Sequence, residues 1–198
     1  MTSVERPRNP RGDGAKLRKE IVSAAIVLMD ASPEAPDLTL RSVARQVGIT
    51  APAIYPHFPD VAAINDEIVT VSYGHLAAAF ATATREAATA SEALYLGCSA
   101  YLEFGRRHPA RYALMSRRPA TAGVLPQAFP LLVAAVQAAI DEGSSASTDA
   151  ARDAATLWAG VHGLSTIVGR AQPTPWGLDY AAPDILCNLV RRVARLAE

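Results

Sequence analysis

The chain has 198 residues, half of them hydrophobic, so it is long and apolar enough to bury a substantial core. Alanine, leucine and valine are frequent and only 6% of the residues are aromatic, a composition that favours helices over a β-sandwich. Its 19 basic and 19 acidic residues give a formal net charge of zero, which by itself argues against a strong nucleic-acid binder.

The sequence indicates a cytoplasmic protein that needs no membrane, metal or disulfide. Residues 1–11 are basic, polar and proline-bearing, and they lack the apolar segment of a secretory signal. The longest apolar stretches, such as residues 131–140, have about half the length that a bilayer requires. The two cysteines, Cys98 and Cys187, lie in helix-patterned segments without metal-binding spacing, and we interpret both as small buried apolar residues. We expect no cofactor.

Basic side chains gather at the N-terminus. Residues 1–19 carry six basic and two acidic side chains, a net charge of +4, so the rest of the chain sums to −4. Two prolines among Arg6, Arg8 and Arg11 indicate an extended arm over residues 1–12, of the kind that follows phosphates or enters a minor groove. A solvated tail without a partner is the alternative interpretation.

Patterns of helical period follow the arm. The first helix begins after a possible cap at Asp13 and is ended by the proline-rich residues 32–36. Thr39 is placed to cap a short second helix that Gly48 ends, and Thr50 to cap a third that runs for about eight residues. Two short helices joined by a glycine-containing turn form a helix-turn-helix. Residues 13–60 are therefore expected to be a three-helix DNA-binding domain.

The remaining patterns are helical as well. Asp60 is placed to cap a long helix, and a short turn of helix carries Tyr112 and Met115. Further helices are expected over residues 91–107, 125–140, 149–169 and 183–197. Residues 143–147, rich in serine, are interpreted as a flexible link. The sequence thus predicts an all-α fold, with a C-terminal helical ligand-binding and dimerisation domain over residues 61–198.

Residues 38–58 read LTLRSVARQVGITAPAIYPHF, with a Thr-x-x-x-Val-Ala helix, a Val-Gly-Ile turn and a Tyr-x-His-Phe ending. In this register the predicted helix-turn-helix resembles the DNA-binding signature of the TetR family of bacterial transcriptional regulators. Residues 158–163, WAGVHG, resemble the Trp/His-Gly motif of one class of TetR C-terminal domains. The resemblance implies a homodimeric repressor that binds palindromic double-stranded DNA and releases it when a small molecule occupies its C-terminal domain.

The resemblance also assigns roles to single residues. Thr39 matches a position that touches a phosphate, as expected at the positive end of a helix. Residues 50–52 match the start of the recognition helix, where Ala51 and Pro52 offer only apolar contact to thymine methyl groups. Tyr55 matches a phosphate-binding tyrosine. The predicted DNA-binding residues are Arg6, Arg8, Arg11, Thr39, Arg41, Thr50, Ala51, Pro52, Tyr55 and His57.

One stretch departs from the family pattern. Relatives usually carry a phosphate-clamping lysine just after the recognition helix, where this chain has residues 58–61, Phe-Pro-Asp-Val. Asp60 would repel a phosphate, although a capping role would direct its carboxylate towards backbone N–H groups. We therefore expect the arginines of the arm to supply more of the affinity than in a typical relative.

The resemblance further implies an effector cavity among the C-terminal helices. The candidate ligand-binding residues are Tyr101, Phe104, Met115, Trp158, His162 and Trp176. Each of these residues could instead be an ordinary core residue. Trp158 and His162 lie one helical turn apart, and they could be a structural pair that holds two helices together. No charged cluster marks a cavity, so the expected effector is largely apolar. The last two helices are expected to form a four-helix bundle with a second copy of the chain.

Two other classes of function are alternatives to a transcriptional regulator. An enzyme needs a nucleophile and a base in one cleft, yet the four histidines have no triad or metal-ligand neighbours in sequence. A helical interaction module without sequence-specific DNA binding would explain the zero net charge and the missing lysine, but not the register of the helix-turn-helix. Activation in place of repression is compatible with the sequence.

Overall fold

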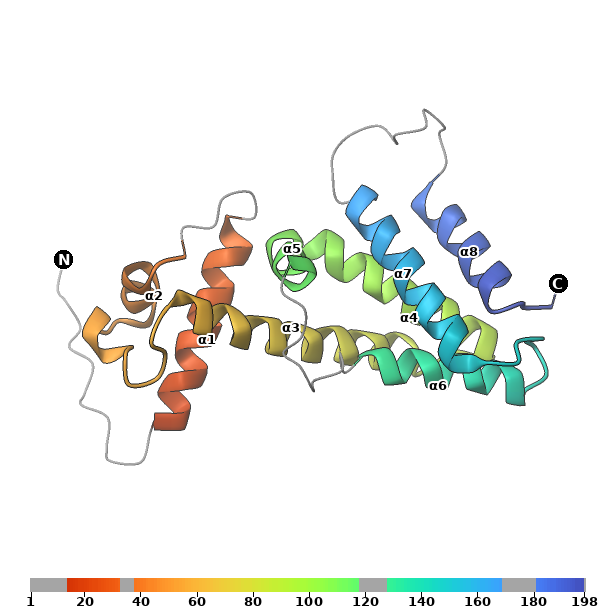
Figure 1. The fold of residues 1–198 in the computed structure, drawn as a ribbon, viewed down its shortest axis with the longest axis horizontal. Coiled ribbons are helices and arrows are strands. Elements are labelled where there is room, and N and C mark those ends of the chain that lie inside the picture. Colours follow the sequence, from red (N-terminus) through yellow and green to blue (C-terminus); the bar gives the residue numbers. More distant parts are fainter. Residues whose placement is uncertain (1–13, 33–37, 118–127, 169–180, 198) are drawn as a thin grey trace.

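The computed structural model describes residues 14–32, 38–117, 128–168 and 181–197. Within these ranges the chain is helical and contains no named strand, which confirms the predicted all-α fold (Figure 1). The elements are α1 (Gly14–Ala31), α2 (Leu40–Val47), the 3-10 turn η1 (Ala51–Ala53), α3 (Val61–Ala83), α4 (Ala90–Arg107), α5 (Pro109–Arg117), α6 (Ala128–Asp141), α7 (Ala150–Val168) and α8 (Ala182–Val193). Among these helices, none has the length and hydropathy of a membrane span.

The molecule is elongated, and α3 runs along its long axis (Figure 1). With 23 residues this helix spans about 34 Å. It packs against α1 near one end and against α4 and α6 along the rest of its length, so it belongs to both parts of the molecule. Helix α5 lies between these parts, in contact with α1, α3 and α4. Helices α7 and α8 pack side by side on the far part, away from α1 and α2.

Three of the predicted caps, at Thr39, Gly48 and Asp60, are present. Thr50 makes no capping hydrogen bond with its side chain, and Asp13 lies outside the described residues. Thr39 accepts from the backbone N–H of Ser42, whose side chain accepts from the backbone N–H of Thr39, so the two residues form a reciprocal capping box. Gly48 ends α2 with a φ of +79°, a left-handed conformation that a glycine adopts without strain. Asp60 caps α3 by accepting from the N–H of Ala63 at 2.8 Å.

The third predicted helix is not an α-helix in the structure. Residues 50–58, called the recognition segment below, form the single 3-10 turn η1 and then hydrogen-bonded turns. The reason lies in its prolines. Pro56 has no N–H to donate to the carbonyl four residues earlier, and its ring disfavours the helical conformation at Tyr55. The sequence interpretation considered only Pro52, which is harmless at a helix start.

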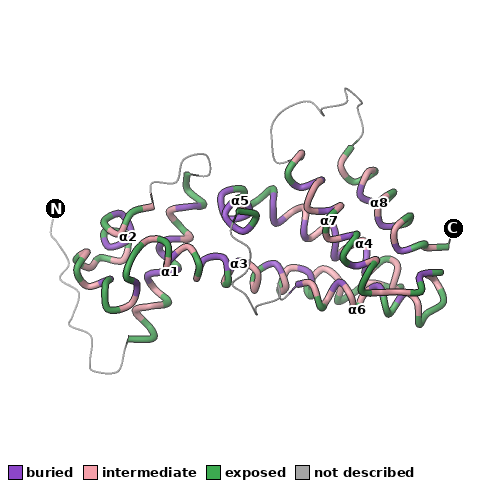
Figure 2. The backbone as a smooth tube through the Cα atoms, in the orientation of Figure 1, coloured by how far each residue is buried: buried purple, intermediate pink, exposed green. Residues whose placement is uncertain are grey.

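Buried side chains form one continuous cluster that extends through both parts of the molecule (Figure 2). Helices α3 and α4 approach closely because Gly97 carries no side chain: a Cβ atom there would lie 2.2 Å from the ring of Phe80. Helices α7 and α8 meet in the same way, since a Cβ atom on Gly160 would lie 2.7 Å from Leu189. The two glycines thus allow α4 to pack closely against α3, and α7 against α8.

Two smaller predictions are also wrong. Residues 143–147 are not a free link, because Ser145 donates to the backbone oxygen of Ala194 at 2.5 Å and the backbone of 144–146 pairs with residues 195–197. This pairing also ends α8 at Val193, short of the expected residue 197.

Cys98 is buried as expected, but Cys187 is exposed, because it lies on the outward face of α8.

A charged cluster joins α1 to α5 and α3. Arg111 of α5 has only 3% of its side chain exposed and donates to Asp30 at the end of α1, with Nε and Oδ1 3.0 Å apart. Its Nη1 lies 3.1 Å from His75 Nδ1 of α3, so that nitrogen accepts and the imidazole is neutral. His108 Nδ1 lies 3.3 Å from Asp30 Oδ2 without hydrogen-bond geometry. The cluster is a main polar connection between the two parts of the molecule.

Acidification is expected to weaken this junction. Partial burial lowers the pKa of His75 and of His108, the Arg111 guanidinium lowers both further, and Asp30 acts in the opposite direction. A histidine with a lowered folded-state pKa binds a proton more readily in the unfolded chain. The free energy of unfolding should therefore fall as the pH drops below about 6.5.

Denaturant unfolding between about pH 7.5 and about pH 5 measures this effect. Replacing both imidazoles, in His75→Gln/His108→Gln, should make the decline shallower, because Gln can still accept from Arg111 but does not titrate. An equally steep decline in the double variant would assign the pH dependence to other groups.

Candidate nucleic-acid interface and C-terminal cavity

The recognition segment presents a polar and aromatic surface at one end of the molecule. Thr50, Pro52 and Tyr55 are exposed, and Tyr55 is 58% exposed, unusual for a large side chain in this structure. Ala51 and His57 are partly exposed beside them. Two residues of the same segment point the other way: Ile54 and Phe58 have no exposed surface. The segment therefore has a buried face that anchors it and a free face on the side where the sequence predicts base contacts.

Two of the predicted residues lie at the start of α2, which packs against η1. Thr39 and Arg41 are both exposed at its N-terminal end. The Thr39 hydroxyl is already engaged with Ser42, so a phosphate there would be met mainly by backbone N–H groups of the first turn. Arg6, Arg8 and Arg11 lie outside the described residues.

One residue at this surface was not singled out from the sequence. Arg18 of α1 donates to the backbone oxygen of His57 at 2.7 Å and to Glu67 Oε2 of α3 at 2.5 Å. Its guanidinium carbon lies 4.1 Å from the centre of the Phe58 ring. The sequence interpretation counted Arg18 only as part of the basic N-terminus, because neither its 39-residue separation from His57 nor that from Glu67 is visible in a local pattern.

A cavity of about 240 Å³ opens between α3, α4, α5 and α7. It is lined by Tyr73, Tyr101, Tyr112, Met115, Ser116, Trp158, Ala159 and His162. Four of the predicted ligand-binding residues, Tyr101, Met115, Trp158 and His162, are therefore brought together. Phe104 is not among them: its ring lies against His108 and the Arg111 guanidinium at the α1 junction. Trp176 lies outside the described residues.

The cavity wall contains a hydrogen-bonded set of two tyrosines and a histidine. His162 Nδ1 lies 2.6 Å from the Tyr112 hydroxyl and 3.2 Å from the Tyr101 hydroxyl. Burial raises the pKa of both tyrosines and of Tyr73, so all three remain neutral phenols over the physiological range. None of the residues lining the cavity carries a permanent charge. A charged ligand would lose its hydration here without gaining a partner of opposite charge.

Aromatic rings give the cavity its shape. Tyr101 packs edge-on against Trp158, with ring centres 5.0 Å apart, and Phe129 of α6 also packs edge-on against Trp158, with ring centres 5.9 Å apart. Trp158 is thus held by rings from two helices, while Tyr101 and Tyr112 meet at 85°. Fixed perpendicular rings form flat walls suited to a flat apolar molecule.

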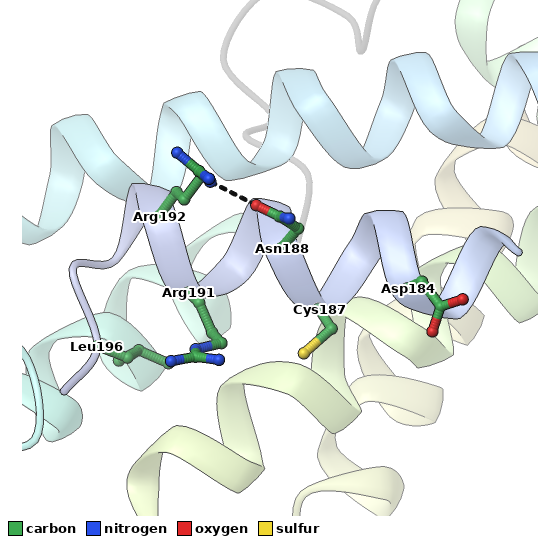
Figure 3. A pocket seen from close by; sticks show the side chains of 6 residues that line it. All are labelled: Asp184, Cys187, Asn188, Arg191, Arg192 and Leu196. Carbon is green, nitrogen blue, oxygen red and sulfur yellow. Dashed lines mark hydrogen bonds between the residues drawn. The ribbon is translucent and has the colours of Figure 1, made fainter. Parts of the chain in front are cut away.

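The outward face of α8 is polar and carries a wide groove of about 470 Å³ (Figure 3). Its walls are Asp184, Cys187, Asn188, Arg191, Arg192 and Leu196, and Arg192 donates to Asn188 at 2.5 Å. The neighbouring face of α7 exposes small residues, Ala151, Ala155 and Ala159. Among the described residues, no cluster of histidine, cysteine or acidic side chains has the form of a metal site.

Comparison with known proteins supports the resemblance found in the sequence. Residues 94–183 match the family model for a tetracyclin repressor-like C-terminal domain. No protein of curated function matches the chain significantly.

Solved structures share the fold over nearly the whole chain. A protein of unknown function from Rhodococcus sp. RHA1 is 24% identical, with a TM-score of 0.75 over 98% of this chain and 100% of that one. A tetR-family regulatory protein from Rhodococcus RHA1 is 19% identical, with a TM-score of 0.62 over 92% and 99% of the two chains. RolR, solved with resorcinol, is 9% identical, with a TM-score of 0.65 over 92% and 90%.

The helix-turn-helix register, the all-helical fold and the match of the C-terminal helices agree with one another. The C-terminal helices therefore resemble a tetracyclin repressor-like C-terminal domain, and the chain as a whole has the fold of the tetR-family regulatory protein from Rhodococcus RHA1.

Proposed function

We propose that this protein is a homodimeric repressor that binds a palindromic operator in double-stranded DNA through the recognition segment and α2. The observation that carries the proposal is the division of the recognition segment into two faces. Ile54 and Phe58 are completely buried, while Thr50, Pro52 and Tyr55 are exposed, and the segment packs against α2. A segment that is buried on one face and exposed on the other can insert its exposed face into a major groove.

Two copies are needed to read a palindrome. Half-sites on one face of DNA lie about 34 Å apart, one helical turn, so a dimer must hold two recognition segments at that spacing. The exposed small residues of α7 and the polar face of α8 lie at the opposite end of the molecule from the recognition segment (Figure 1). We assign the dimer surface to these two helices, since it leaves both DNA-binding ends free.

The release of DNA is assigned to the cavity around His162. Helix α5 contacts both functional regions: Tyr112 lines the cavity, and the adjacent Arg111 binds Asp30 of the DNA-binding part. A ligand that displaces Tyr112 would therefore move the residue that holds α1. Because the cavity wall is neutral and aromatic, we propose an uncharged, largely apolar effector with one or two hydrogen-bonding groups.

Selection of bound DNA from a random duplex pool tests the DNA-binding role. We expect enrichment of a palindrome whose half-sites are centred about 10 base pairs apart, and tight binding by a dimer. Tyr55→Ala should weaken binding of the enriched duplex, while Tyr95→Ala, in α4, changes a tyrosine remote from that surface. Failure to enrich any sequence would favour the alternative of an interaction module.

The arm is expected to supply much of the electrostatic affinity. Deletion of residues 1–11 removes Arg6, Arg8 and Arg11. If all three contact phosphates, the slope of log affinity against log salt should become shallower by about 2 to 3. Fluorescence anisotropy across a salt series measures this slope, with Arg85→Gln as a remote single-charge control. Unchanged affinity and slope would mean that the arm stays solvated in the complex.

The cavity is expected to distinguish neutral from charged ring compounds. Resorcinol and benzyl alcohol should raise the unfolding temperature, whereas benzoate and benzylamine at equal concentration should not. Tyr112→Phe removes the hydroxyl that bonds His162 and should weaken binding of the neutral compounds by about tenfold. Tyr95→Phe, a matched change outside the cavity lining, should leave binding unaltered. Equal stabilisation by charged compounds would contradict the assignment.

A further inference from the structure

We propose that Arg18 is a positioning residue for DNA recognition: it fixes the recognition segment against α1 and α3, and does not act as a phosphate contact. The inference rests on the proposed DNA-binding function. It assigns a role to a side chain that the charge pattern alone groups with the phosphate-binding arm.

Arg18 connects three separate parts of the chain. It extends from the N-terminal half of α1, and its two terminal nitrogens donate to the His57 backbone oxygen and to the Glu67 carboxylate. The same guanidinium lies over the ring of Phe58, with 4.1 Å between its carbon and the ring centre. Arginine suits this position because a planar group with several fixed donors can bond two acceptors while stacking on a ring.

The recognition segment needs such an external contact because its own hydrogen bonding is weak. Pro56 donates nothing, and the turn around Ile54 is closed by N–H groups of His57 and Phe58 that share one carbonyl oxygen. In a continuing helix the carbonyl of His57 would accept from residue 61. Pro59 and Asp60 interrupt the helix there, so the carbonyl is left for Arg18.

The position of the His57 carbonyl determines where the exposed face points. His57 and Tyr55 both lie within three residues of this bond, and Phe58 is the buried anchor that the guanidinium covers. A small rotation of the segment about Ile54 and Phe58 would move the exposed side chains relative to the bases. Loss of Arg18 should therefore reduce discrimination between sequences more than it reduces attraction to DNA in general.

The charge of Arg18 is offset by its partner. Glu67 lies in direct contact, so the pair contributes little net charge to the DNA-facing end. This gives a test in which electrostatics and positioning predict opposite results. If the charge of Arg18 attracts phosphate, removal of the Glu67 charge should strengthen binding to DNA. If Arg18 positions the recognition segment, the same change should weaken binding to the specific sequence.

The experiment compares Arg18→Lys, Arg18→Gln, Glu67→Gln and the control Lys19→Gln, which alters an exposed cation one residue away. Each variant is measured on the duplex enriched with the wild-type protein and on a scrambled duplex of equal length, over a salt series. We expect Arg18→Lys and Glu67→Gln to lower the ratio of specific to scrambled affinity by about tenfold or more, with the salt slope unchanged. Lys19→Gln should preserve the ratio.

Two results would overturn the proposal. Equal weakening on both duplexes in Arg18→Gln, with the slope reduced by about 1, would identify Arg18 as a phosphate contact. Retention of the specificity ratio in Arg18→Lys would show that the fixed geometry is not required.

Hydrogen exchange on the free protein separates this inference from the DNA-binding proposal. In Arg18→Lys the backbone N–H groups of His57 and Phe58 should exchange faster, while those in the centre of α1 should not. Unchanged exchange would refute the positioning role even if the protein binds no specific DNA. If exchange is faster in Arg18→Lys but the selection enriches no duplex, the contact made by Arg18 is supported and the DNA-binding function is refuted.

Discussion

The burial of Phe58 is the constraint on which the placement of the recognition segment depends. The ring has no exposed surface, and it ends a segment that has only one 3-10 turn of regular structure. A regular recognition helix would be held by its own backbone ladder. This segment is held by side chains instead: Phe58 and Ile54 from within, and Arg18 across the Phe58 ring. The pose of the exposed face is therefore a property of tertiary packing, and it is sensitive to changes in α1 and α3.

The same dependence on packing extends to communication between the two parts. Arg111 and Tyr112 are adjacent in α5, yet one binds Asp30 of α1 and the other lines the C-terminal cavity. A nearly buried guanidinium needs its carboxylate partner, because an unpaired charge would lose hydration without compensation. Two adjacent residues of α5 thus contact the cavity and α1, which places α5 between the proposed sites.

Local signals accounted for much of the fold, and long-range contacts account for what they missed. The caps at Thr39, Gly48 and Asp60 were predictable because capping depends on residues three or four positions apart. The lining of the cavity was predicted only in part, since Tyr73 joins Tyr101 and His162 through the packing of α3 on α4. Cys187 was misplaced because its pattern gives a helix but not the outward face of α8.

The charge distribution bears on how such a protein would select its DNA. The lysine common in relatives is absent at residues 58–61, and the cation nearest the recognition segment in α1, Arg18, is paired with Glu67. The exposed residues Thr50, Pro52 and Tyr55 of the recognition segment carry no charge, whereas the exposed cation Arg41 lies on α2. Electrostatic attraction is therefore weak at the recognition segment itself, and sequence discrimination there must come from shape and from the fixed placement of a few side chains. That placement is what the buried anchors and Arg18 provide.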